Sequence, residues 1–159
     1  MYSIKTDGAE VRICFMTDDI IRVRSSFDQQ FEEESYALSL TAWPDRLDPI
    51  LGQLRKRIEP LKIDVVESDE FLTFQTKSLK LKISKKPYSL EIINQDGISL
   101  QKELPGRAHK TDLQGRVYHF HNFDSVNDCF YGFGETTGTL NKRKKSIKLK
   151  PMDSLGHDA

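Results

Sequence analysis

The chain has 159 residues, a length that suits one domain with a hydrophobic core and is too short for two ordinary domains. Its 24 basic and 24 acidic side chains cancel, so the net charge gives no reason to expect nucleic acid or an anionic membrane as a partner. No segment approaches the roughly 18 consecutive apolar residues of a membrane span, and the N-terminus lacks the apolar stretch of a signal peptide. These features predict a cytoplasmic protein.

Alternating apolar and polar side chains predict short strands along most of the chain. Residues 11–15 and 21–24 alternate in this way, and residues 17–19 between them suit the turn of a hairpin. The same pattern predicts further strands at residues 63–66, 71–76, 79–83, 90–93, 98–100 and 117–123. Turn-forming residues separate several of these segments. Strands at this spacing are typical of an antiparallel sandwich.

One segment has helical rather than strand periodicity. Its apolar residues recur three or four positions apart: Leu47, Ile50, Leu51, Leu54 and Ile58. Asp48 and Pro49 suit an N-cap and a first helical position. The spacing predicts a short helix over residues 49–57. Upstream, three consecutive glutamates within residues 29–35 predict a solvated loop.

A basic run at residues 142–145, extended by Lys148 and Lys150, has the charge needed to bind phosphates. Ile147 and Leu149 alternate with the two later lysines, as expected for the solvated face of a strand. No aromatic residues interleave to stack on bases. We therefore expect no nucleic-acid partner.

The histidines raise the possibility of a metal site. His119 and His121 are two residues apart and should project from the same face of a strand. Zinc sites in proteins use three or four ligands, and His109 lies across a loop without an obvious geometry for joining them. We expect no metal site, and no motif indicates a cofactor.

The cysteines and the nucleophile motifs offer little evidence for catalysis. Cys14 and Cys129 could form a disulfide, but without a secretion signal we expect both to be reduced and partly buried. Cys129 lies in an apolar and aromatic segment, where a buried thiol would be inert. No serine or cysteine triad has a supporting local motif, so we assign no catalytic residue.

The last thirty residues hold the most informative pattern. Residues 131–143 read YGFGETTGTLNKR, and Asp153 follows ten residues later. Glycines able to adopt a positive φ predict a tightly shaped loop here: Gly132, Gly134 and Gly138. With its flanks, residues 130–158, the segment closely resembles the N-terminal β-sandwich domain of glycoside hydrolase family 31, the retaining α-glucosidases and their relatives.

The resemblance implies an all-β fold, an antiparallel β-supersandwich of the galactose-mutarotase-like type, here with one short helix. Residues 1–159 would be a single N-terminal domain that stops before the catalytic (β/α)₈ barrel. Family members use two barrel aspartates to cleave α-glycosidic bonds with retention. The implied role is a non-catalytic domain that packs on the barrel, and we expect this chain alone to be inactive.

Asp153 is the one site residue that the resemblance implies. In family members the aspartate at this place accepts hydrogen bonds from hydroxyls of the sugar in the −1 subsite, and one carboxylate can accept from two adjacent hydroxyls. Pro151 and Met152 stand where family members often have Trp and Asn, so only Asp153 is carried over. Trp43-Pro44-Asp45 superficially resembles the nucleophile motif, but a different sequence follows it and Asp45 fits a turn.

Two other functions stay open. A free-standing carbohydrate-binding or mutarotase-like module would need a His and Glu pair, and His119 or His121 with Glu91 or Glu103 has no supporting motif. A purely structural or interaction domain is the third possibility. If the chain is instead the N-terminal domain of a family 31 enzyme, its partners are an oligosaccharide substrate and the missing barrel. Self-association is also expected, since truncating the sandwich would leave strand edges unpaired.

Overall fold

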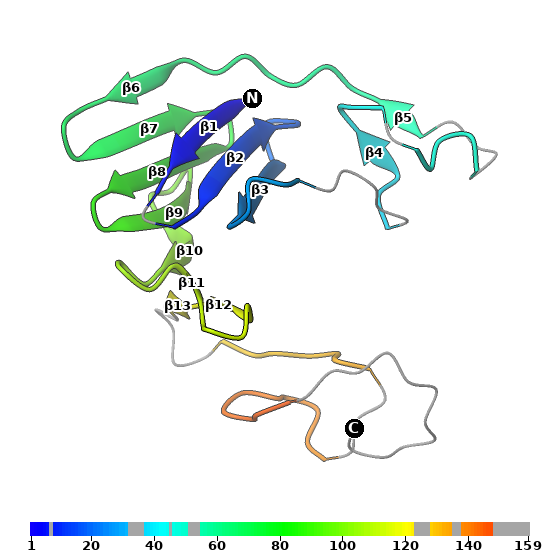
Figure 1. Ribbon diagram of the computed structural model, residues 1–159, viewed down its shortest axis with the longest axis vertical. Coiled ribbons are helices and arrows are strands. Elements are labelled where there is room, and N and C mark those ends of the chain that lie inside the picture. Colours follow the sequence, from blue (N-terminus) through cyan, green and yellow to red (C-terminus); the bar gives the residue numbers. More distant parts are fainter. Residues whose placement is uncertain are drawn as a thin grey trace. The chain divides into compact units, whose positions relative to one another are not determined.

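The computed structural model describes residues 1–6, 8–31, 37–44, 46–50, 55–122, 128–134 and 138–147. Two compact units make up the chain, Met1–Asn122 and Phe123–Ala159 (Figure 1). All thirteen strands of the described residues lie in the first unit. In the described part of the chain, no helix is long and apolar enough to cross a membrane.

A three-stranded antiparallel sheet opens the first unit, in the order β1-β2-β3. It contains β1 (Tyr2–Lys5), β2 (Glu10–Phe15) and β3 (Ile21–Ser26), drawn in blue in Figure 1. β2 and β3 pair from Glu10↔Ser26 to Phe15↔Ile21, and the Met16 N–H donates to the Ile20 carbonyl at 2.9 Å. The hairpin predicted for this segment is confirmed.

A six-stranded antiparallel sheet follows, in the order β13-β10-β9-β8-β7-β6. It contains β6 (Val65–Glu67), β7 (Phe71–Gln75), β8 (Leu79–Lys85), β9 (Tyr88–Asn94), β10 (Ser99–Glu103) and β13 (His121–Asn122). The single strand predicted over residues 117–123 is instead broken at Phe120. Before the break, β12 (Val117–His119) pairs with β11 (His109–Thr111), whereas β13 pairs with β10.

The hydrophobic core lies between these two sheets. Side chains from β2 pack against side chains from β7, β8 and β9, and the buried cluster is Val11, Ile13, Phe15, Phe74, Leu81, Ile83, Tyr88, Leu90 and Ala108. Phe74 is at its centre, with its ring centroid 5.3 Å from that of Phe15 and 4.7 Å from that of Tyr2. Each buried valine, leucine, isoleucine or phenylalanine of this cluster contributes about 1.5–3 kcal/mol by leaving water. Two sheets facing across one core confirm the predicted all-β sandwich.

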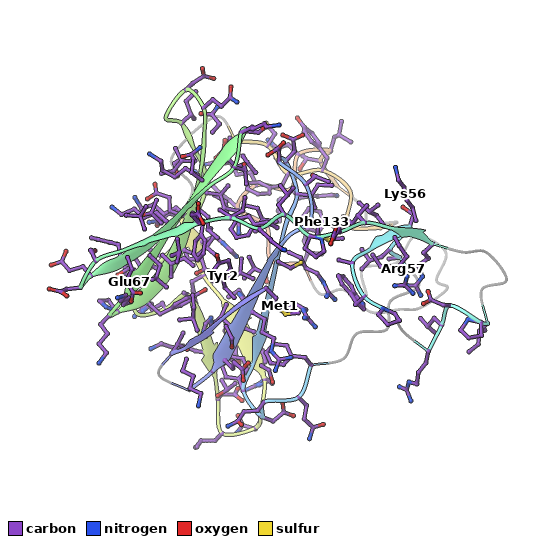
Figure 2. All side chains as sticks on the ribbon, turned by 90° about the horizontal axis from the view of Figure 1, so that it is seen from above. Met1, Tyr2, Lys56, Arg57, Glu67 and Phe133 are labelled. Carbon is purple, nitrogen blue, oxygen red and sulfur yellow. The ribbon has the colours of Figure 1, made fainter. Side chains whose placement is uncertain are left out.

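The helix predicted over residues 49–57 is wrong at both described ends, while residues 51–54 lie outside the described residues. Pro49 and Ile50 lie in a turn in which the Ile50 N–H donates to the Leu47 carbonyl at 3.0 Å. Lys56–Arg57 forms β5, which pairs in parallel with β4 (Leu40–Thr41). Figure 2 shows Lys56 and Arg57 on opposite sides of the chain, as in a strand.

Long-range contacts explain why this segment is not helical. The Lys56 and Ile58 N–H groups donate to the carbonyls of Ser39 and Thr41 at 3.1 and 3.0 Å. The Arg57 guanidinium donates to the Thr41 hydroxyl at 2.9 Å and is ion-paired with Asp48. Helix propensity amounts to a few tenths of a kcal/mol per residue, so these pairings outweigh it.

Candidate functional site

The glycine-rich loop lies in the second unit, and its backbone has the predicted character. Gly132, Gly134 and Gly138 have φ angles of 93°, 76° and 97°, in the region that favours glycine. Phe133 between them has φ 70°, which is uncommon for a residue with a side chain. The prediction of a tightly shaped loop is confirmed for the described residues.

Asn141 holds this loop together. Its Oδ1 accepts hydrogen bonds from the N–H groups of Phe130 and Arg143 at 3.1 and 3.0 Å, and its Nδ2 donates to the Cys129 Sγ at 3.2 Å. Around it, the Arg143 guanidinium donates to the Asp128 carbonyl at 2.8 Å. Sequence reasoning missed this role, although an Asn that accepts from the N–H two residues on is a common turn device.

The basic run forms part of a cavity in the same unit. Its walls enclose about 450 Å³ and come from Phe130, Phe133, Lys142, Arg143, Lys144, Lys145 and Ile147. The Lys145 N–H donates to the Lys142 carbonyl at 3.1 Å, so this run turns. Residues 142–147 are not in a strand, and the rest of the alternating segment, Lys148 to Lys150, lies outside the described residues, so the strand predicted there stays a prediction. Aromatic walls with a cationic rim can bind an apolar ring that carries acceptors.

Asp153, the predicted sugar-binding residue, lies outside the described residues, and so does Asp45. The role of Asp153 therefore stays a prediction. Trp43 belongs to the segment that resembles the nucleophile motif. The Arg22 guanidinium carbon lies over its ring, 3.8 Å from the ring centroid. This contact gives the tryptophan a structural role at the surface of β3.

The structure brings three histidines of the first unit into a row. His119 and His121 stack with ring centroids 6.2 Å apart and planes 10° apart, so the two rings are neighbours as predicted, although they lie on two strands, β12 and β13, rather than on one. His109 pairs with His119 across β11 and β12, with ring centroids 6.1 Å apart. Sequence reasoning considered His109 but found no geometry that would bring it to the other two, because only the pairing of β11 with β12 does so. No group of three or more His, Cys, Asp or Glu within the described ranges could hold a metal ion.

Glu103 is a buried carboxyl beside this row. It lies opposite His121 in the pairing of β10 with β13, so the two side chains share a face of the sheet. Its Oε2 accepts a hydrogen bond from the Leu90 N–H at 2.9 Å. Burial raises its pKa to about 7, and the bond from Leu90 opposes the rise only in part. Glu91, the other glutamate considered, pairs instead with Lys102, at 3.3 Å.

The two cysteines are not joined in a disulfide, and they differ in exposure. Cys14 is buried, which agrees with the prediction, and the thiol of a buried cysteine is protected from reaction. Cys129 is exposed, so the prediction that it is buried is wrong. Its segment follows the loop around Asn141 rather than entering a sheet.

The fold and the loop agree with a comparison against known families. A family described as the glycosyl hydrolase 31 N-terminal galactose mutarotase-like domain matches residues 10–159. This match covers most of the chain, and the chain belongs to that family.

Individual relatives give the same picture. Alpha-glucosidase 2 from Bacillus thermoamyloliquefaciens is 30% identical over 156 residues, which are 96% of this chain and 17% of the relative. A GH31 dextranase from Flavobacterium johnsoniae, solved with isomaltotriose, has a TM-score of 0.71 at 19% identity, over 96% of this chain and 18% of that one. A cycloalternan-forming enzyme from Listeria monocytogenes was solved with a pentasaccharide substrate. It has a TM-score of 0.60 at 20% identity, over 94% of this chain and 13% of that one. The chain therefore spans less than a fifth of these relatives.

Proposed function

We propose that this chain is the non-catalytic N-terminal domain of a retaining glycosidase that acts on α-glycosidic bonds of oligosaccharides. The observation that carries the proposal is the 30% identity to an α-glucosidase over 156 residues, together with the family match over residues 10–159. In the full-length protein the domain packs on a catalytic (β/α)₈ barrel. The barrel supplies the two carboxyl groups, about 5–5.5 Å apart, that a retaining mechanism needs.

The contribution of this domain to the sugar site is one loop. Asp153 follows the segment that Asn141 and the positive-φ glycines shape, and its carboxylate accepts hydrogen bonds from two hydroxyls of the sugar in the −1 subsite. A charge-assisted bond of this kind contributes about 1.5–3 kcal/mol. The hydrogen bonds that Asn141 makes within the loop favour this role, because a carboxylate orients a substrate only if the backbone that carries it is held in place.

Activity measurements test this function directly. The purified 159-residue chain should leave p-nitrophenyl α-glucoside intact, whereas the same chain continued into a downstream barrel should hydrolyse it with retention. Turnover by the purified 159-residue chain that survives repurification would refute the assignment of catalysis to the barrel. A longer protein without turnover on any α-glucoside would refute the glycosidase function.

A further inference from the structure

His109 joins the β11–β12 hairpin to segments from both sheets of the first unit. Its Nε2 lies 3.2 Å from the hydroxyl of Thr6, the residue that follows β1. Its ring centroid lies 5.5 Å from that of Phe27, which follows β3, and 4.8 Å from that of Tyr88 on β9. The preceding residue, Ala108, is 2% exposed and belongs to the core. The His109 ring is therefore a point at which the hairpin is attached to the sandwich.

The hydrogen bonds of His109 suit a neutral ring and not a charged one. The Thr6 hydroxyl has one proton, which it donates to the Ala9 carbonyl at 3.0 Å. The same oxygen therefore accepts from the His109 Nε2, and the neutral ring carries its proton there. The His109 Nδ1 is buried without a hydrogen-bond partner among the described residues. A second proton would go to this atom and leave a buried, charged N–H group without an acceptor, which destabilises the folded state.

Two basic side chains of the hairpin lie next to His109. The His119 ring centroid is 6.1 Å away across the β11–β12 pairing, and Lys110 follows His109 along β11. Both oppose a positive charge on His109 when they are themselves charged. Burial, and then the His119 ring, lower the pKa of His109, and burial, and then His121, lower the pKa of His119. Protonation of either ring is therefore disfavoured while the hairpin stays in place.

The described acidic groups on the hairpin and on β10 do not offset a charge on His109. Burial raises the pKa of Glu103 to about 7, so this carboxyl is neutral before a histidine with a lowered pKa gains its proton. Asp112 is already ion-paired, at 2.6 Å, with an arginine of the same hairpin turn. The Tyr88 hydroxyl stays neutral, because burial, and then Glu103, raise its pKa. Asp7 lies outside the described residues.

The packing around His109 leaves room for the hairpin to move. A cavity of about 350 Å³ lies beside the ring, lined by residues that follow β1 and β3, by Pro87 and Tyr88, and by β11. Side chains that border an unfilled volume lose part of their van der Waals contact. Local opening of the hairpin should therefore require less free energy than unfolding of the core.

We propose that His109 is a pH-sensitive attachment point, which holds the β11–β12 hairpin on the sandwich when its ring is neutral and releases the hairpin when the ring gains a second proton. A histidine with a lowered pKa binds its proton more tightly in the opened state. Attachment is therefore fully favoured above the ordinary value of 6.5 and is weakened as pH falls through it. Glu103 has the opposite effect, because its raised pKa stabilises the folded state in acid. Acid-dependent opening would thus report on histidine.

Amide hydrogen exchange of the 159-residue chain at about pH 7.5 and about pH 5.5 tests the proposal. The reporters are the Leu104 N–H, which donates to the Phe120 carbonyl at 3.0 Å, and the Phe120 N–H, which donates to the Ala108 carbonyl at 3.3 Å. A released two-stranded hairpin is only marginally stable, so both bonds should open. Their protection factors should fall about threefold or more in acid, relative to that of Thr76 in the turn between β7 and β8. Equal changes at all three amides would overturn the proposal.

Neutral replacements of His109 distinguish its protonation from a general effect of acid. His109→Gln keeps a group that can donate to the Thr6 hydroxyl oxygen, and His109→Phe keeps an aromatic ring beside Phe27. In both variants the protection of Leu104 should no longer fall between about pH 7.5 and about pH 5.5. His121→Gln is the matched control, because it removes a histidine that stacks on His119 and not on His109, and it should keep the response. An acid response that persists in both His109 variants would refute the proposal.

Titration of the His109 ring in the unmodified chain gives a measurement that does not depend on whether a variant folds. Its imidazole C–H NMR signal should titrate below 6.5, and over the same pH range in which the protection of Leu104 falls. A midpoint at or above 6.5, or a midpoint outside the range of the exchange response, would overturn the proposal. Every residue in the proposal belongs to the first unit, so turnover by the longer protein has no bearing on it.

Discussion

Replacing Glu103 with Gln should stabilise the protein at about pH 8 and have little effect at about pH 4. Glu103 is 6% exposed, and burial raises its pKa from 4.5 to about 7. The folded state therefore binds this proton more tightly than the unfolded state does. Its contribution is fully present below the unfolded pKa near 4.5 and is lost as pH rises through about 7.

The magnitude follows from the same pKa values. Each pKa unit corresponds to about 1.4 kcal/mol, so a buried Glu103 carboxylate costs the folded state on the order of 3 kcal/mol at about pH 8. Gln carries no charge at any of these pH values, and its Oε1 can still accept the hydrogen bond that the Leu90 N–H donates at 2.9 Å. The variant should gain about 2–3 kcal/mol of unfolding free energy over the parent at high pH.

Urea unfolding of parent and variant at several pH values measures this difference, and subtracting the two curves removes the titration of groups common to both chains. Glu70→Gln gives the matched control, because Glu70 is an exposed glutamate in the turn before β7. A stability difference between the Glu103→Gln chain and the parent that is the same at about pH 4 and about pH 8 would refute the reasoning.

Three further predictions concern the loop and the sheet edges. In the full-length protein Asp153→Ala should lower kcat/KM about ten- to a hundred-fold without unfolding it, and a wild-type kcat/KM in a folded variant would contradict the subsite role. Asn141→Ala should make the backbone near Arg143 exchange its amide protons faster, because two N–H groups lose their acceptor, while exchange in β8 stays unchanged. The 159-residue chain should self-associate at micromolar concentration in sedimentation through edge strands such as β6, where Val66 is 72% exposed. Val66→Lys should reduce this association, and a parent that sediments only as monomer would count against it.

Much of the sandwich could be predicted because alternation is a local consequence of burying one face of a strand. β2, β3 and β7 to β9 each carry apolar residues at every second position, and residues of each of these strands lie in the core or pack against it. The loop could be predicted for a similar reason. Positive φ is a property of single residues, and Gly132, Gly134 and Gly138 are the residues that tolerate it.

The candidate sites depended instead on neighbours far apart in the sequence. His109 and His119 meet because β11 pairs with β12, and nothing in the local pattern around either residue predicts that the Tyr88 ring lies 4.8 Å from His109. Glu103 ends a segment whose sequence resembles that of an ordinary strand. Only the tertiary structure buries its carboxyl group beside the Leu90 N–H, and this burial raises its pKa.

The sequence by itself therefore determined the strand-rich class, the hairpin of β2 and β3, the glycine-shaped loop and, through residues 130–158, the family. Tertiary structure alone decided that Lys56 and Arg57 form a strand, since their partners Leu40 and Thr41 are sixteen residues away. It also decided that the Tyr88 hydroxyl and the His109 Nδ1 are buried without a hydrogen-bond partner among the described residues. The physical reason is that backbone propensities act within a few residues, whereas pairing and desolvation depend on which distant segments come together.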